Sequence, residues 1–311
     1  MKLNLVNNIS WSDHRSGWEY VLQNLTPFQS KDGLVVDGFI DKTFGYGVNY
    51  SKETLDTLLN HSWVGFIHHP INICPWYYQD NLSPSYVFDS EGFIEASKQC
   101  EAIFTLSSHL AEFVKMKTGI MTYSLIHPTE IPQDKFNFRR FTKDKKVVHI
   151  GTWMRKFSSF YKLRAEAYKK YLLCNSITMQ YLKSELQYCK QVSANELNSV
   201  DLLSHLDNSK YDLLLNESVV FLDLFDSSAN NTVIECIVRE TPLIVNKIPS
   251  VVEYLGESYP LYYRNLEEAE AFLNDTQTIK KAHEYLKEEV DKERFSVKYF
   301  IESLEKTGLF T

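Results

Sequence analysis

The stretch Val219–Val245, VVFLDLFDSSANNTVIECIVRETPLIV, decides the fold. It begins with a short apolar run, passes through a small polar loop, and continues with apolar residues at helical spacing before a second apolar run starts at Pro242. Short apolar runs that alternate with helix-period segments are typical of parallel sheets with helices on both faces. We therefore predict an α/β fold.

The same alternation recurs in both halves of the chain. The predicted strands are Leu3–Val6, Leu34–Ile40, Trp63–Ile67, Ala102–Leu106, Thr122–Ile126, Lys146–Ile150, Ile177–Tyr181, Val219–Leu224, Pro242–Val245 and Leu261–Tyr263. The predicted helices are Ser108–Thr118, Ser158–Leu173, Asn231–Arg239, Ser250–Leu255, Leu266–Asn274 and most of Thr278–Lys306. The first of these helices has Ser107 or Ser108 as a candidate N-cap and Gly119 as a candidate left-handed stop.

The length of 311 residues favours two domains of about 150 residues each. Residues 131–146 lose apolar periodicity and become basic, which is typical of a linker. We predict a first Rossmann-like domain over residues 1–140, a second over residues 141–290, and a C-terminal helix in residues 291–311.

Composition excludes several classes of protein. The hydrophobic fraction of 44% is that of an ordinary globular chain and argues against disorder. The formal net charge of −7 provides no overall basic field, so we expect no nucleic-acid partner. Five widely spaced cysteines indicate free thiols, and the sequence has neither a signal-peptide stretch nor a long apolar run. We expect a cytoplasmic protein with no stable membrane insertion.

The segment after the predicted strand Lys146–Ile150 is a candidate phosphate site. Ligands of open parallel sheets bind at the carboxyl ends of the strands. Gly151 permits a sharp turn at the strand end, and Thr152 follows it. The adjacent cations Arg155 and Lys156 can neutralise a diphosphate. The alternative is a solvated pair of surface charges.

The loop and helix start in 224–235 are a second candidate. Asn230 or Asn231 can cap the helix that continues through Thr232, and the free amides and dipole of a helix start favour a phosphate. Glu235, one turn further on, can accept hydrogen bonds from a ribose diol. The alternative is a capping loop with a solvated glutamate.

The first half offers histidines at a strand end. His68 and His69 follow the predicted strand Trp63–Ile67, where they can bind acceptor or sugar hydroxyls or act as a base. The alternative is a histidine that only orients a loop.

Taken in order, the segments 150–156, 224–235 and 242–256 resemble the nucleotide-sugar-binding half of GT-B glycosyltransferases, especially the retaining group with a Glu-x7-Glu signature. The resemblance covers residues 147–263 and implies two Rossmann-like domains that face each other across a cleft, with the acceptor on the first. It implies that Arg155 and Lys156 contact the donor phosphates, although the family usually spaces these cations apart. It also implies that Glu235, the second glutamate of the signature, contacts the donor ribose.

The first glutamate of the signature is missing. Ser227 stands eight residues before Glu235, and Asp226 can substitute only if the loop shifts by one residue. In this family the first glutamate lies near the transferred sugar, so Asp226 becomes a catalytic candidate. Residues 291–311 resemble the family's tail helix, which packs back on the first domain.

The resemblance implies a glycosyltransferase, a hexosyl- or pentosyltransferase, that moves a sugar from a nucleotide-sugar donor, UDP- or GDP-linked, to a hydroxyl of a glycan, lipid-linked or protein-linked acceptor. We expect a retaining reaction that needs no cofactor beyond the donor and no metal, because the sequence has no Asp-x-Asp pair. If the reaction inverts, Asp13, after the first predicted strand, is the candidate base. A non-catalytic sugar-nucleotide-binding GT-B scaffold and a sugar-nucleotide epimerase are the alternatives.

Overall fold

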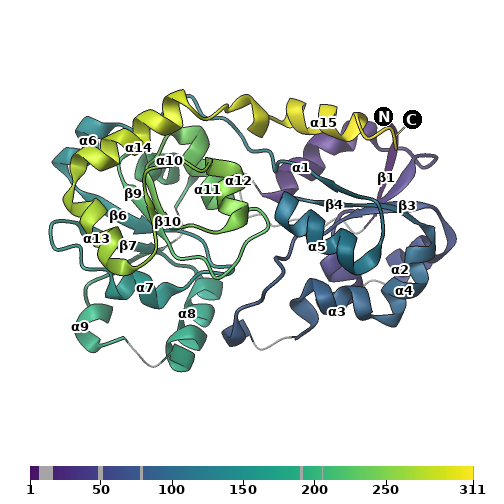
Figure 1. The fold of residues 1–311 in the computed structure, drawn as a ribbon, viewed down its shortest axis with the longest axis horizontal. Coiled ribbons are helices and arrows are strands. Elements are labelled where there is room, and N and C mark those ends of the chain that lie inside the picture. Colours follow the sequence, from purple (N-terminus) through teal and green to yellow (C-terminus); the bar gives the residue numbers. More distant parts are fainter. Residues whose placement is uncertain (7–16, 48–51, 78–79, 190–191, 205, 311) are drawn as a thin grey trace.

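The computed structural model describes residues 1–6, 17–47, 52–77, 80–189, 192–204 and 206–310. These residues form two parallel sheets, each with its own helices, in two lobes that lie side by side (Figure 1). The expected α/β class with two parallel-sheet domains is confirmed.

The first sheet has the strand order β1-β2-β3-β4-β5, with all neighbours parallel. Its strands are β1 (Leu3–Val6), β2 (Leu34–Asp37), β3 (Trp63–Phe66), β4 (Cys100–Thr105) and β5 (Thr122–Ser124). Its helices include α1 (Trp18–Leu25), α2 (Lys52–Asn60), α3 (Pro84–Asp89), α4 (Glu91–Ala96) and α5 (Ser108–Thr118).

The second sheet has the order β11-β10-β9-β6-β7-β8, also parallel throughout. Its strands are β6 (Lys146–His149), β7 (Lys169–Leu173), β8 (Asp201–Leu203), β9 (Val219–Leu222), β10 (Leu243–Asn246) and β11 (Tyr262–Tyr263). Its helices include α6 (Phe138–Lys143), α7 (Phe157–Lys162), α8 (Ser176–Cys189), α9 (Ala194–Leu197), α10 (Asn208–Asn216), α11 (Asn231–Arg239), α12 (Pro249–Leu255), α13 (Leu266–Asn274) and α14 (Thr276–Glu288).

The central strands are covered on both faces. Every residue of β3 and β9 is buried, as expected for strands of a parallel sheet between helix layers. The last helix, α15 (Val297–Glu305), crosses to the first lobe (Figure 1), where Phe300 and Leu304 join the core that contains Leu3 and Trp18.

Most predicted elements are confirmed within a few residues, and three helices match residue for residue. Helix α5 shows why: Ser107 accepts the amide of Leu110, and Gly119 ends the helix at φ 72°. Helices α11 and α13 begin in the same way, because the side chains of Asn230 and Asn265 accept amides of their first turns.

Two predictions in residues 158–181 were wrong. The predicted helix Ser158–Leu173 is α7 followed by strand β7, because pairing with β6 and β8 outweighs the local helical spacing. The predicted strand Ile177–Tyr181 lies within α8. Asn175 accepts the amide of Thr178 at 2.8 Å and so starts a helix that its β-branched residues do not favour alone.

Two further segments are more divided than predicted. The segment 131–146 is not a linker along its whole length, because it contains α6, and Phe136 and Phe141 are buried in the core of the second lobe. The predicted helix Thr278–Lys306 is interrupted between α14 and α15, where Ser296 accepts the amide of Tyr299 and starts a new helix.

Candidate functional site

The second sheet reverses its strand order between β6 and β9, and the loops that leave these two strands are hydrogen-bonded to each other. In the β6 loop, residues 150–156, the amide of Lys156 donates to the carbonyl of Asp223 at 2.9 Å. The carbonyl of Met154 accepts the amide of Phe225, also at 2.9 Å. Such a reversal is where open parallel sheets bind ligands, and the phosphate-site candidates lie there.

The β6 loop has an unusual backbone. Gly151 has φ +88°, and a Cβ at this position would lie 2.5 Å from Nη2 of Arg155. Met154 also lies in the left-handed region, at φ 61°, which is costly for a residue with a side chain. The loop conformation therefore depends on its surroundings and places the guanidinium of Arg155 directly against Gly151.

Arg155 is a buried cation whose hydrogen bonds go to neutral groups. Its Nη2 donates to Oδ1 of Asn230 at 3.0 Å and to Oγ1 of Thr232 at 3.1 Å, and Nη1 donates to the carbonyl of Trp153. Its Nε is buried and has no partner within the described residues. Burial lowers the pKa of Arg155 to about 10. A buried cation without an anion in direct contact is unfavourable until an anion binds.

Lys156 differs from its neighbour because it already has a carboxylate. Its Nζ lies 3.2 Å from Oδ1 of Asp223 and 6.0 Å from the ring centroid of Phe225. Ser159 donates to the other oxygen of Asp223 at 2.5 Å. The structure therefore places the two predicted cations in the same loop but on different partners.

The start of α11 lies beside Arg155. Asn230 caps the helix by accepting the amide of Val233 at 3.3 Å, and Asn231 and Thr232 are its first two residues. Thr152, predicted at the same site, is hydrogen-bonded through its hydroxyl to that of Thr178 in α8, at 2.6 Å. Both candidate segments thus meet where the amides of a helix start and a buried guanidinium can share one anion.

Glu235 lies one turn into α11 and is held from a neighbouring helix. The carboxylate is buried and accepts a hydrogen bond from the hydroxyl of Tyr211 in α10. The next residue of α10, Asp212, accepts two hydrogen bonds from Arg239, at 3.1 and 2.6 Å. Two successive residues of α10 therefore brace two residues of α11 that are one turn apart.

Asp226 lies at the contact between the two lobes. Its Oδ2 accepts the backbone amide of Asn72 at 3.0 Å and the side-chain amide of Asn72 at 2.8 Å. Its Oδ1 accepts the amide of Ser227 at 2.7 Å. This candidate catalytic carboxylate is therefore engaged in holding a loop of the first domain against the second.

His68 and His69 are both anchored by Asp41. The two carboxylate oxygens accept the amides of His68 at 2.8 Å and His69 at 3.1 Å. The His68 ring stacks on Phe39 at 4.1 Å, and burial lowers the pKa of His68 to about 4, which makes the ring neutral at pH 7. The His69 ring lies 4.8 Å from that of Trp153 in the β6 loop.

Of the predicted site residues, His69 is brought to the β6 loop and Asp226 to the contact between the lobes, whereas Asp13 lies outside the described residues. Three residues that position others were not predicted from the sequence: Asp41, Tyr77 and Tyr211. Asp41 follows β2 closely, so the rule that polar residues after strands face the site applied to it as well. Tyr77 and Tyr211 carried no such signal.

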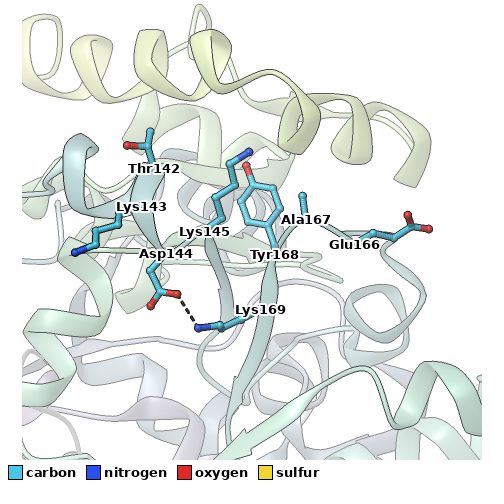
Figure 2. Close-up of a pocket in the computed structure, with 8 residues that line it drawn as sticks. All are labelled: Thr142, Lys143, Asp144, Lys145, Glu166, Ala167, Tyr168 and Lys169. Atoms are coloured by element: carbon cyan, nitrogen blue, oxygen red, sulfur yellow. Dashed lines mark hydrogen bonds and ion pairs between the residues drawn. The ribbon is translucent and has the colours of Figure 1, made fainter.

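A hollow of about 350 Å³ lies at the opposite edge of the second sheet, beside the first residues of β6 and β7 (Figure 2). Its lysines do not converge on one point: Lys169 pairs with Asp144 at 2.7 Å, while the side chains of Lys143 and Lys145 point apart (Figure 2). Lys145 lies over the Tyr168 ring at 5.6 Å. This hollow is at the amino ends of the strands and does not belong to the site.

The described part of the chain contains no cluster of three or more histidine, cysteine, aspartate or glutamate side chains arranged to hold a metal ion. Among the helices described, none combines the length and the apolar character needed to cross a bilayer.

Comparison with solved structures shows the GT-B fold. HepE from Anabaena, solved in complex with UDP and glucose, aligns with a TM-score of 0.66 at 13% identity over 99% of each chain. A point mutant of TarM from S. aureus, solved with Fondaparinux, alpha-GlcNAc-glycerol and UDP, aligns with a TM-score of 0.61 at 13% identity. That alignment covers 93% of this chain and 58% of TarM. Sucrose-phosphate synthase from Thermosynechococcus elongatus aligns with a TM-score of 0.62 at 11% identity over 94% of this chain and 76% of its own.

No family model matches the sequence, and no curated protein matches it.

Proposed function

We propose that this chain is a glycosyltransferase that takes a sugar from a nucleoside-diphosphate donor and transfers it to an acceptor hydroxyl. The observation that carries the proposal is Arg155, a buried guanidinium that contacts no carboxylate among the described residues, beside the start of α11 and at the reversal point of the sheet. A diphosphate supplies the anion that this position lacks. The GT-B fold, and the UDP in the HepE and TarM structures, favour a nucleotide-sugar as its source.

In the proposed reaction the bond between the anomeric carbon and the diphosphate oxygen breaks, and its electron pair stays on the diphosphate. This charge is stabilised by Arg155 and by the first amides of α11. Lys156 adds to the stabilisation once Asp223 is displaced from it. These groups perform the neutralisation that a metal would otherwise provide, so the proposed reaction needs neither a metal nor a further cofactor. Glu235, held by Tyr211, accepts hydrogen bonds from the ribose hydroxyls. UDP and GDP are the favoured nucleotides.

We further propose that the configuration at the anomeric carbon is retained. The carboxylate of Asp226 already accepts three hydrogen bonds, two of them from Asn72. A departing diphosphate oxygen, and not Asp226, takes the proton of the acceptor hydroxyl. The acceptor oxygen bonds to the anomeric carbon on the face from which the diphosphate leaves. The hydroxyl belongs to a glycan or to a lipid-linked or protein-linked acceptor. The anomeric coupling constant in the proton NMR spectrum of the product distinguishes retention from inversion.

The first experiment measures UDP and GDP binding by titration calorimetry, with Arg155→Met as the test variant and Arg139→Met as the control. Arg139 is an exposed residue of α6 in the second lobe. Arg155→Met should weaken nucleotide binding about 100-fold, since two charge-assisted hydrogen bonds to phosphate are lost. Its thermal midpoint should not fall, because an uncompensated buried cation is removed.

Nucleotide binding by Arg155→Met at the wild-type affinity would contradict the assignment. Failure of the wild type to bind any nucleoside diphosphate would contradict the proposed function itself. Nucleotide binding without product formation across a panel of glycan acceptors would favour the non-catalytic scaffold.

A further inference from the structure

Tyr77 belongs to the first domain, but its hydroxyl is bonded to the β6 loop of the second. It donates to the carbonyl of Thr152 at 3.0 Å and accepts the amide of Met154 at 2.9 Å. The side chain is 5% exposed, so both hydrogen bonds are shielded from water. A single hydroxyl from one domain therefore satisfies two backbone groups that lie one and three residues before Arg155.

The Met154 side chain is also buried by the first domain. It is 1% exposed and packs in a cluster with Cys74, Trp76, Tyr77 and Leu82. The sulfur of Cys74 lies 3.7 Å from that of Met154. Left-handed backbone at a residue with a side chain persists only where its surroundings impose it, and the surroundings of Met154, at φ 61°, include these residues of the first domain.

The aromatic contacts of Trp153 add to this arrangement. The Tyr77 ring lies 4.6 Å from that of Trp153, and the His69 ring lies 4.8 Å from it on the same indole. Residues 152–154 of the β6 loop thus all contact the first domain, and the next residue is Arg155. If the domains separated, the two backbone groups would exchange Tyr77 for water, and Met154 would leave the cluster that it forms with Cys74, Trp76 and Leu82.

We propose that Tyr77 is a positioning residue for the donor site: it holds the β6 loop in the conformation that presents Arg155, so that the site is complete only when the first domain is docked. This inference rests on the proposed function, because it assigns Arg155 to the diphosphate. Coupling between two equilibria is reciprocal. A nucleotide that binds the completed site therefore stabilises the docked arrangement by the same factor by which docking improves its affinity.

The test uses the full chain with Tyr77→Phe and the matched control Tyr181→Phe. The Tyr181 ring lies 4.4 Å from that of Tyr77 in the same cluster, and its hydroxyl makes no hydrogen bond to any described residue. Each variant removes one oxygen atom and keeps the ring, so both are expected to fold. Only the first removes the two hydrogen bonds to the β6 loop.

Two measurements decide the question. Calorimetry with UDP or GDP, whichever the wild type binds more tightly, should show affinity about tenfold weaker for Tyr77→Phe and within about twofold of wild type for Tyr181→Phe. Hydrogen exchange without nucleotide should show the Met154 amide exchanging at least about tenfold faster in Tyr77→Phe alone, since this amide loses its acceptor.

Unchanged affinity for this nucleotide or unchanged protection of the Met154 amide in Tyr77→Phe overturns the inference, as does equal weakening of nucleotide binding by both variants. If the wild type binds neither UDP nor GDP, the proposed function fails, and the assignment of Tyr77 to a donor site fails with it. The exchange measurement is independent of nucleotide and still decides whether Tyr77 holds the loop.

Discussion

Replacing His149 with leucine should stabilise the protein, and more so in acid. His149 is the last residue of β6 and is fully buried, with its ring centroid 5.2 Å from that of Phe157 and 5.4 Å from that of Phe160. Neither ring nitrogen has a hydrogen-bond partner in the described part of the chain. Burial, helped by the nearby charge of Arg155, lowers the pKa of His149 to about 3.

The sign of this pH dependence follows from how strongly the folded and the unfolded states bind the proton of His149. Because the pKa in the folded state is lower than that in the unfolded state, the unfolded chain binds the proton first as the pH falls below about 6.5. Wild type therefore loses stability between about pH 6.5 and pH 3. At pH 5 the loss from this histidine is about 2 kcal/mol, and at pH 7.5 it is close to zero.

Leucine has nearly the same volume and no polar atoms. At pH 7.5, His149→Leu should raise the free energy of unfolding by about 1 kcal/mol, because an unsatisfied buried polar group is removed. At pH 5 the gain should grow to about 3 kcal/mol, since the protonation loss is removed as well.

Urea unfolding at pH 7.5 and pH 5, followed by tryptophan fluorescence, measures both differences. His61→Leu controls for the change of residue type, since His61 is exposed. A gain from His149→Leu that is the same at both pH values would refute the reasoning.

Two further predictions concern the proposed donor site. Tyr211→Phe removes the hydroxyl that donates to Glu235. The preference for UDP over 2′-deoxy-UDP, measured by calorimetry, should therefore be about fivefold smaller in the variant than in the wild type. An unchanged ratio of the two affinities would rule out a ribose role for Tyr211 and Glu235. Gly151→Ala places a Cβ 2.5 Å from Nη2 of Arg155 at φ +88°, so it should lower both UDP affinity and the free energy of unfolding, the latter by about 2 kcal/mol. Gly119→Ala, at φ +72° with open space around the added Cβ, should lower stability by less and leave UDP affinity unchanged, and equal effects of the two alanines on affinity would contradict the steric argument.

The sequence predicted the elements whose signals are local. Helix α11 is an example, because the cap at Asn230 and the apolar spacing that follows lie within ten residues. Strand β7 is the opposite case: Lys169–Leu173 continues a helical pattern and becomes a strand only because β6 and β8 pair with it. Lys170 fits that position because its ammonium reaches the carbonyls of Tyr161 and Leu163 at the end of α7.

The candidate site divides in the same way. Strand ends and helix starts can be predicted from the sequence, and this places Arg155, Asn230 and Glu235 in one predicted site. Their roles stay predictions. The hydrogen-bond or ion-pair partner of each residue could not be predicted from the sequence. Lys156 pairs with Asp223, and Asp226 with Asn72, because these contacts depend on how two loops and two domains meet.

The sequence by itself determined the α/β class, the two parallel sheets and the post-strand segments that carry the candidate chemistry, because periodicity and capping act between residues a few positions apart. Only the tertiary structure decided the strand order that brings the β6 loop beside α11. It also decided that Tyr77 from the other domain is hydrogen-bonded to this loop. The physical reason is that a contact between residues 75 positions apart depends on the packing of whole domains, and the spacing of neighbouring residues carries no record of it.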